Sequence, residues 1–172
     1  MKKSNMLIYL FLILALMSCQ TEEYKSHRFN YNYYSEKHFF SFEYPERWEI
    51  SEDDASQFDR FPEKSPDFGL EILMGNEEEI KNSISIFEGV SPNMYIQDEN
   101  LSKDDFLVNG EKKGYIYSNQ FLLEKDNRVS KIILYDTNDD NFAWRYVIIS
   151  AEKKFYNKNK KKIEKVLNSI DF

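Results

Sequence analysis

The sequence is poor in cysteine, proline and glycine. Of 172 residues, one is cysteine, four are proline and five are glycine. A single cysteine excludes an internal disulfide bond, so the fold has to be held together by its packed core. Scarce proline and glycine, in a chain without internal repeats, exclude a low-complexity linker. Fourteen phenylalanines and twelve tyrosines supply apolar surface for a core.

The sequence also lacks an apolar run of membrane-spanning length at its start. The run MLIYLFLILALM covers only residues 6–17, whereas a spanning helix needs about 20 residues. It follows Lys2 and Lys3 and has the length of the apolar region of a secretory signal peptide. We therefore expect residues 1–18 to be a signal peptide that is removed.

The only cysteine stands directly after this run, in LMSCQTEE. Leu16, Ser18 and Cys19 resemble the lipobox of bacterial lipoproteins, in which a lipid is attached to the cysteine before the signal is cut away. A thiol is a strong nucleophile and can accept a diacylglyceryl group. The resemblance implies lipidation of Cys19 and a membrane anchor, for which about two acyl chains are needed. A secreted protein with an incidental cysteine, or an uncleaved anchor, would give the same pattern.

The residues that follow the cysteine bear on location. Gln20, Glu22 and Glu23 resemble a sorting signal that displays lipoproteins on the outer face of the outer membrane in some bacteria. A plain polar linker explains them equally, in which case the protein faces the periplasm. In both cases we expect a lipid-anchored protein of the cell envelope, with residues 19–27 as lipidated cysteine and tether.

Charge and length describe the chain after the signal peptide. Removing residues 1–18 takes away two lysines and no acidic residue, which leaves 154 residues, 21 of them basic and 30 acidic, and a formal charge of −9. We expect no nucleic-acid partner for such an acidic chain. This length suits one domain that buries roughly 68–70% of its unfolded surface. We place that single domain at residues 28–172.

Aromatic residues alternate with polar ones near the start of the domain. Phe or Tyr occupies positions 29, 31 and 33, and again positions 40, 42 and 44. This predicts two half-buried strands joined by a turn at SEKH, residues 35–38. Pro45 is expected to interrupt strand pairing because it lacks an N–H, and Trp48 to fold back over the core.

The middle of the domain predicts further strands, the last three of them in an antiparallel meander. They are expected at residues 69–75, 83–89, 113–123, 129–136 and 142–150. The Asn-Gly pair at 109–110 and the polar connections between the last three are typical of tight hairpins. A short helix is expected near residues 52–60, and a brief capped turn at Ser102 and Asp105.

The final segment has helical rather than alternating periodicity. Apolar residues recur at Tyr156, Ile163, Val166, Leu167 and Ile170. This predicts an amphipathic helix over about 153–168, laid across the sheet, and a short strand at 170–172. The fold class expected is therefore α+β: an antiparallel sheet of about six strands with a C-terminal amphipathic helix packed on it.

Two stretches resemble the PsbP-like family. FFSFEYPERWEI, residues 39–50, resembles its opening hairpin, and KKIEKVLNSIDF, residues 161–172, resembles its closing helix and strand. The resemblance covers most of residues 28–172 and implies an α/β/α sandwich around an antiparallel sheet. It also implies a protein that binds partners without catalysis. Its motifs are structural, so it assigns no functional residue.

Patterns for catalysis and cofactors are weak. GVSPN, residues 89–93, approaches a nucleophile elbow, but it lacks the second glycine, and Pro92 has no N–H for an oxyanion. His27 and His38 could meet Glu36 around a metal, although two surface histidines on a hairpin are the simpler interpretation. We expect no enzyme activity and no cofactor.

A second metal pattern lies in DTNDDN, residues 136–141. Asp136, Asn138 and Asp140 are weak calcium candidates at the spacing of an EF-hand loop. Val147 stands where that loop needs a bidentate glutamate. A polar hairpin turn is the expected structure.

Positive charge is concentrated in the final helix. Residues 152–165 hold seven lysines and two glutamates, a formal charge of +5, which leaves −14 for the rest of the chain after residue 18. Such a basic stripe could meet lipid phosphates or an acidic partner, and a solvated helix face is the alternative. The candidate partner-binding residues are Lys154, Lys158, Lys161, Lys162 and Lys165.

Three functions remain open from the sequence. The first is a non-catalytic accessory lipoprotein that binds an unknown envelope protein. The second is a carrier of a small ligand or ion, with a pocket between sheet and helix. The third is an enzyme of unrecognised type.

The lipidation site is directly testable. Cells grown with a fatty-acid analogue should label the wild-type protein, and Cys19→Ala should abolish the label, because no other thiol is present. Labelling is read after capture of the protein from membranes. Label that persists in Cys19→Ala would mean that the site is misassigned.

Overall fold

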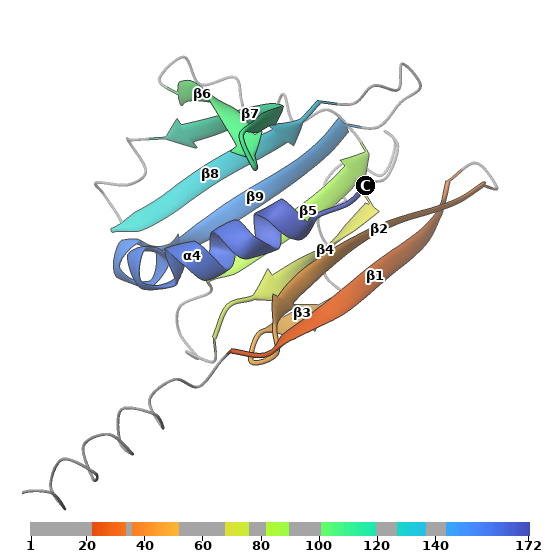
Figure 1. Ribbon diagram of the computed structural model, residues 1–172, viewed down its shortest axis with the longest axis horizontal. Helices are drawn as coiled ribbons and strands as arrows, with labels where there is room; N and C mark the ends of the chain where they lie inside the picture. The colour runs from red at the N-terminus through yellow and green to blue at the C-terminus, as the bar shows by residue number, and fades with distance from the viewer. Residues whose placement is uncertain are drawn as a thin grey trace, which may run out of the picture.

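The sheet, the hairpin and the helix are arranged in two layers. The computed structural model describes residues 22–33, 36–51, 68–75, 82–89, 101–119, 127–136 and 144–172. These residues form a seven-stranded antiparallel sheet, a separate two-stranded hairpin, and the helix α4 (Lys153–Ser169). The helix and the hairpin lie on the same face of the sheet, and α4 also packs along the hairpin (Figure 1).

The hairpin consists of β1 (Tyr24–Tyr33) and β2 (Glu36–Pro45). Pairing runs without a break from Tyr24 opposite Pro45 to Tyr33 opposite Glu36. The two predicted strands are thus confirmed, but the turn predicted at residues 35–38 is wrong, since residues 36–38 belong to β2. Strand pairing extends this far because His38 continues the alternation of ring side chains in β2. Its ring stacks on that of Tyr31, with 5.4 Å between ring centroids.

Pro45 and Trp48 behave as the sequence predicts. Pro45 is the last residue of β2, and its carbonyl accepts a hydrogen bond from the Trp48 N–H at 2.9 Å. This turn brings Trp48 back over the core, where it is buried.

The large sheet has the strand order β3-β4-β5-β9-β8-β7-β6, with every neighbour antiparallel. The sheet has seven strands where about six were predicted; β3 and β6 were not predicted as strands. Strands β7, β8 and β9 form the expected meander. Strands β4, β5, β7, β8 and β9 match the predicted ranges within the described residues, with shifted ends. The bounds are β3 (Glu49–Ser51), β4 (Phe68–Leu73), β5 (Ser83–Gly89), β6 (Leu101–Val108), β7 (Glu111–Asn119), β8 (Arg128–Tyr135) and β9 (Trp144–Glu152).

Strand β6 corrects one prediction. The brief capped turn expected at Ser102 and Asp105 is wrong, because both residues pair with β7. Asn109 and Gly110 have φ values of +53° and +84°, which suit the tight turn that joins these strands. Strand β6 was not predicted because its charged residues interrupt the alternation of apolar and polar residues. A strand at the edge of a sheet tolerates such charged residues. The helix predicted at 52–60 lies outside the described residues.

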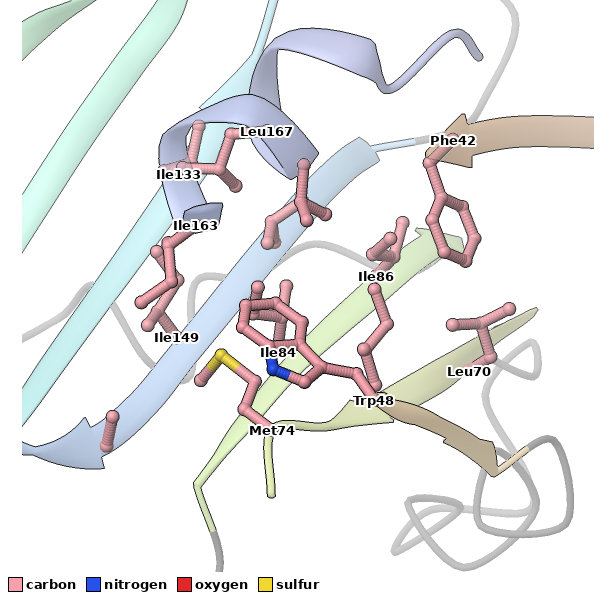
Figure 2. Packing of buried hydrophobic residues seen from close by; sticks show 14 of the residues in the cluster. Phe42, Trp48, Leu70, Met74, Ile84, Ile86, Ile133, Ile149, Ile163 and Leu167 are labelled. Carbon is pink, nitrogen blue, oxygen red and sulfur yellow. The ribbon is translucent and has the colours of Figure 1, made fainter. Parts of the chain in front are cut away.

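The core lies between α4, the hairpin and the sheet (Figure 2). Ile163 and Leu167 point from α4 toward Ile149 of β9 and Ile133 of β8. These four side chains are 0–5% exposed, and Trp48 belongs to the same cluster. The predicted amphipathic helix is confirmed, and it ends one residue later than expected. The α+β fold class, an antiparallel sheet with a C-terminal helix packed on it, is likewise confirmed.

The last residues join the hairpin instead of forming a full strand. Asp171 makes an isolated bridge with Ser41 of β2 through two backbone hydrogen bonds of 2.8 and 2.9 Å. The Phe172 ring lies 5.6 Å from the Phe40 ring and 5.0 Å from the Tyr135 ring. Within the described residues, a helix covers only one face of the sheet. The second helical layer that an α/β/α sandwich would have is not part of the described ranges.

Gly114 is the backbone position least able to accept a side chain. A Cβ there would lie 1.9 Å from the Leu134 carbonyl oxygen, and its φ is +154°. Gly114→Ala should therefore lower the free energy of unfolding by about 3 kcal/mol, because β7 and β8 must separate. Gly110→Ala is the control, since its Cβ meets nothing within 4 Å, and only backbone strain of about 1 kcal/mol applies. Urea denaturation measures both, and equal losses would contradict the close approach.

Candidate functional site

The described core contains a buried ion pair near the C-terminal end of β5. The Nε of Arg145 donates to Oε1 of Glu88 at 2.8 Å, and the Glu88 side chain is 4% exposed. The hydroxyl of Tyr31, from the hairpin, donates to the other oxygen of Glu88. Both carboxylate oxygens therefore have a donor, and the charge is balanced by the guanidinium.

Strand alternation positions this network. Glu88 follows Ile84 and Ile86 on the core-facing side of β5, and the register places Arg145 of β9 directly opposite it. The Arg145 guanidinium also lies 5.6 Å from the Phe172 ring centroid, a cation–π contact. The network thus connects the hairpin, the two central strands and the C-terminus. It is suited to holding these elements together, because both oxygens of the carboxylate are bonded to side chains from other strands.

The sequence analysis did not single out Glu88 or Arg145. The signal that could have found Glu88 is its place in the series Ile84, Ile86, Glu88, where a carboxylate takes a core-facing position. A carboxylate at such a position needs a cationic or hydrogen-bonding partner.

Four lysines form a stripe along the outer side of α4. Lys154, Lys158, Lys161 and Lys165 recur at intervals of four, three and four, which places them on one side of a helix. The buried residues Asn159, Ile163, Val166 and Leu167 lie on the other side. All four ammonium groups belong to exposed residues. We call these four residues the lysine stripe.

Lys162, the fifth predicted partner-binding lysine, turns toward the start of the domain. Its ammonium forms an ion pair with Glu22. The neighbouring Lys165 lies 3.4 Å from the Tyr24 ring centroid and 3.7 Å from the Glu43 carboxylate. Burial, and then the carboxylates of Glu22 and Glu43, raise the pKa of Tyr24 above its usual value. We call this group, Glu22, Tyr24, Glu43, Lys162 and Lys165, the N-terminal junction.

The junction corrects the predicted extent of the tether. Residues 24–27 belong to β1, so the tether predicted over residues 19–27 is too long at its C-terminal end. The reason is that Tyr24 already pairs with Pro45 and packs against Lys165 of the helix. Cys19 and Gln20, together with the predicted signal peptide, lie outside the described residues.

The predicted metal ligands do not come together where the structure describes them. His27 is opposite Phe42 and His38 is opposite Tyr31, so the two histidines do not face each other across the hairpin. Asp136 is exposed after β8, and its N–H donates to the Lys113 carbonyl at 2.8 Å. Asn138 and Asp140 lie outside the described residues, as do residues 90–93 of GVSPN. Across the described ranges, no three His, Cys, Asp or Glu residues are grouped so that they could hold a metal ion.

Comparisons with known proteins give a distant similarity. The chain is similar to the solution structure of a cyanobacterial PsbP (CyanoP) from Synechocystis, with 10% identity, a TM-score of 0.48, and coverage of 88% of this chain and 95% of that chain. No family model and no curated protein matches the sequence. In the described part of the chain, no helix has both the length and the apolar character needed to cross a membrane.

The buried ion pair gives a stability prediction. Glu88→Gln should lower the free energy of unfolding by about 2 kcal/mol, because Arg145 loses its charged partner inside the core. Glu111→Gln is the matched control, since Glu111 pairs with Lys113 at 3.0 Å with both side chains largely exposed, and it should cost under about 1 kcal/mol. Chemical denaturation compares them. If the two variants lose the same stability, the network does not hold these elements together.

Proposed function

We propose that this protein is a lipid-anchored accessory protein of the cell envelope that binds a protein partner and catalyses no reaction. The observation that carries the proposal is the position of the only cysteine, directly after an apolar segment of signal-peptide length. Acyl chains on Cys19 would hold the domain at a membrane surface.

The described interior is compatible with a binding module. Glu88 is committed to Arg145 and Tyr31, and this contact joins elements of the fold. The hydroxyl of Tyr135 donates to the Leu167 carbonyl at 3.1 Å, and burial raises the pKa of Tyr135 well above its usual range, which keeps it neutral. These polar groups stabilise the packing of the elements that they join.

The carrier hypothesis needs a cavity between sheet and helix. In the described residues that space is occupied by Ile163, Val166 and Leu167 of α4, packed on the central strands with exposures of 0–5%. A close-packed interface of this kind leaves no room for a ligand at that place. The accessory hypothesis is therefore preferred over the carrier hypothesis.

The proposal assigns the protein contact to the face of the sheet that α4 does not cover. Tyr115 and Tyr117 of β7 lie on that face, because Ile116 between them packs against the core. Lys103 and Lys112 lie 3.8 and 3.9 Å from the Tyr115 ring centroid, and Leu107 beside them is 54% exposed. Tyr115 and Tyr117 are half-buried, and tyrosine is enriched among the residues that carry most of the binding energy at protein interfaces.

Photo-crosslinking from this patch tests the proposed function. A photoreactive amino acid at position 107 should give a crosslinked protein of discrete mass in intact envelopes, and the crosslink should be lost when Cys19→Ala releases the protein from the membrane. The same amino acid at exposed Glu49, a position on the far edge strand β3, is the control. If the crosslinked products obtained from position 107 are the same as those from position 49, the partner does not bind through this surface.

A further inference from the structure

Three members of the lysine stripe, Lys154, Lys158 and Lys161, have no role assigned so far in the fold or in the proposed protein contact. Its members point away from the buried side of α4, so removing their charge leaves the core unchanged. Lys165 is shared with the N-terminal junction, where it contacts Tyr24 and Glu43. The stripe therefore needs a separate explanation.

The position of the chain's start gives that explanation. Glu22 is in contact with Lys162, at the middle of α4. Cys19 is three residues earlier, and a fully extended chain covers at most about 3.5 Å per residue, so its Cα lies within about 10 Å of that of Glu22. An acylated Cys19 sits at the surface of the bilayer. The anchor thus limits how far the middle of α4 can move from the bilayer surface, to a separation on the order of the Debye length of roughly 8 Å at physiological salt.

Charge decides which side of the domain faces the bilayer. The formal charge is +5 over residues 152–165 and −14 over the rest of the chain after residue 18. Anionic head groups repel the acidic parts of the domain and attract the basic helix face, so the tethered domain has an electrostatically preferred orientation.

We infer that the lysine stripe contacts anionic lipid head groups of the membrane in which Cys19 is anchored, so that the domain lies with α4 against the bilayer. This inference rests on the proposed lipid anchor. A bilayer is favoured over an acidic protein as the occupant because the anchor gives the head groups a high effective concentration at this face.

This orientation agrees with the proposed protein contact. Tyr115 and Tyr117 lie on the sheet face opposite α4, so the domain that rests on α4 presents them away from the bilayer. The anchor and the stripe would then determine the distance and direction of the partner surface from the membrane.

The test uses the acylated full-length product, purified from membranes and reconstituted into vesicles. A single new cysteine at exposed Asn157, beside the stripe, carries a fluorophore, and a head-group quencher reports its proximity to the lipid. Phosphatidylcholine vesicles are compared with vesicles that also contain phosphatidylglycerol. We expect stronger quenching with phosphatidylglycerol, and loss of that increase at high salt.

Matched variants separate a local effect from net charge. Replacing Lys154, Lys158, Lys161 and Lys165 by Gln should abolish the phosphatidylglycerol-dependent increase. Replacing four exposed basic residues elsewhere, Arg28, Lys37, Arg47 and Lys113, by Gln changes the net charge equally and should preserve it. The inference is overturned if both sets of variants change the phosphatidylglycerol-dependent quenching equally. It is also overturned if the stripe variant keeps this quenching and instead loses binding to an acidic protein.

The acylation state is measured on the same sample. Acylated Cys19 without lipid-dependent quenching overturns the orientation and leaves the anchor intact. Unmodified Cys19 overturns the proposed anchor and, with it, the orientation.

Discussion

The apolar face of the sheet, shared between α4 and the β1–β2 hairpin, is the constraint on which the rest of the structure depends. Alternate residues of β5 and β9, such as Ile84, Ile86 and Ile149, are fully buried under these two covers. Each such side chain contributes about 1.5–3 kcal/mol relative to exposure. The helix packs on β8 and β9, the hairpin packs on β4, and the helix and the hairpin also pack on each other. Both elements are therefore needed to bury this face of the sheet.

This shared packing brings the two ends of the domain together. Glu22 and Tyr24 contact the second half of α4, while Asp171 pairs with Ser41 of β2 and Phe172 packs between Phe40 and Tyr135. The Glu88–Arg145 pair lies under the same hairpin and is completed by Tyr31. A lipid on Cys19 would therefore act three residues before Glu22, which contacts the helix, and the fold would limit the orientation of the domain.

Much of the fold could be predicted from local periodicity. Alternating aromatics identified the hairpin, and the helical spacing of Ile163, Val166 and Leu167 identified α4. Strand β6 was missed because its charged residues carry no apolar alternation at the sheet edge. The sequence pattern could not show that the hairpin stays separate from the large sheet. Alternation of apolar and polar residues indicates a half-buried strand, but it does not indicate which strand pairs with it. The contacts of Glu88, Lys162 and Lys165 depend on residues at least 50 positions away, which no local pattern reports.

Attachment of this acidic domain to a membrane by lipid on Cys19 underlies both proposals. Intact-protein mass spectrometry of the mature chain, purified from its natural membranes, tests this attachment most directly. We expect a chain that begins at residue 19 and carries the added mass of a diacylglyceryl group, with or without a further acyl chain. A free thiol at Cys19, or a different first residue, would contradict the account.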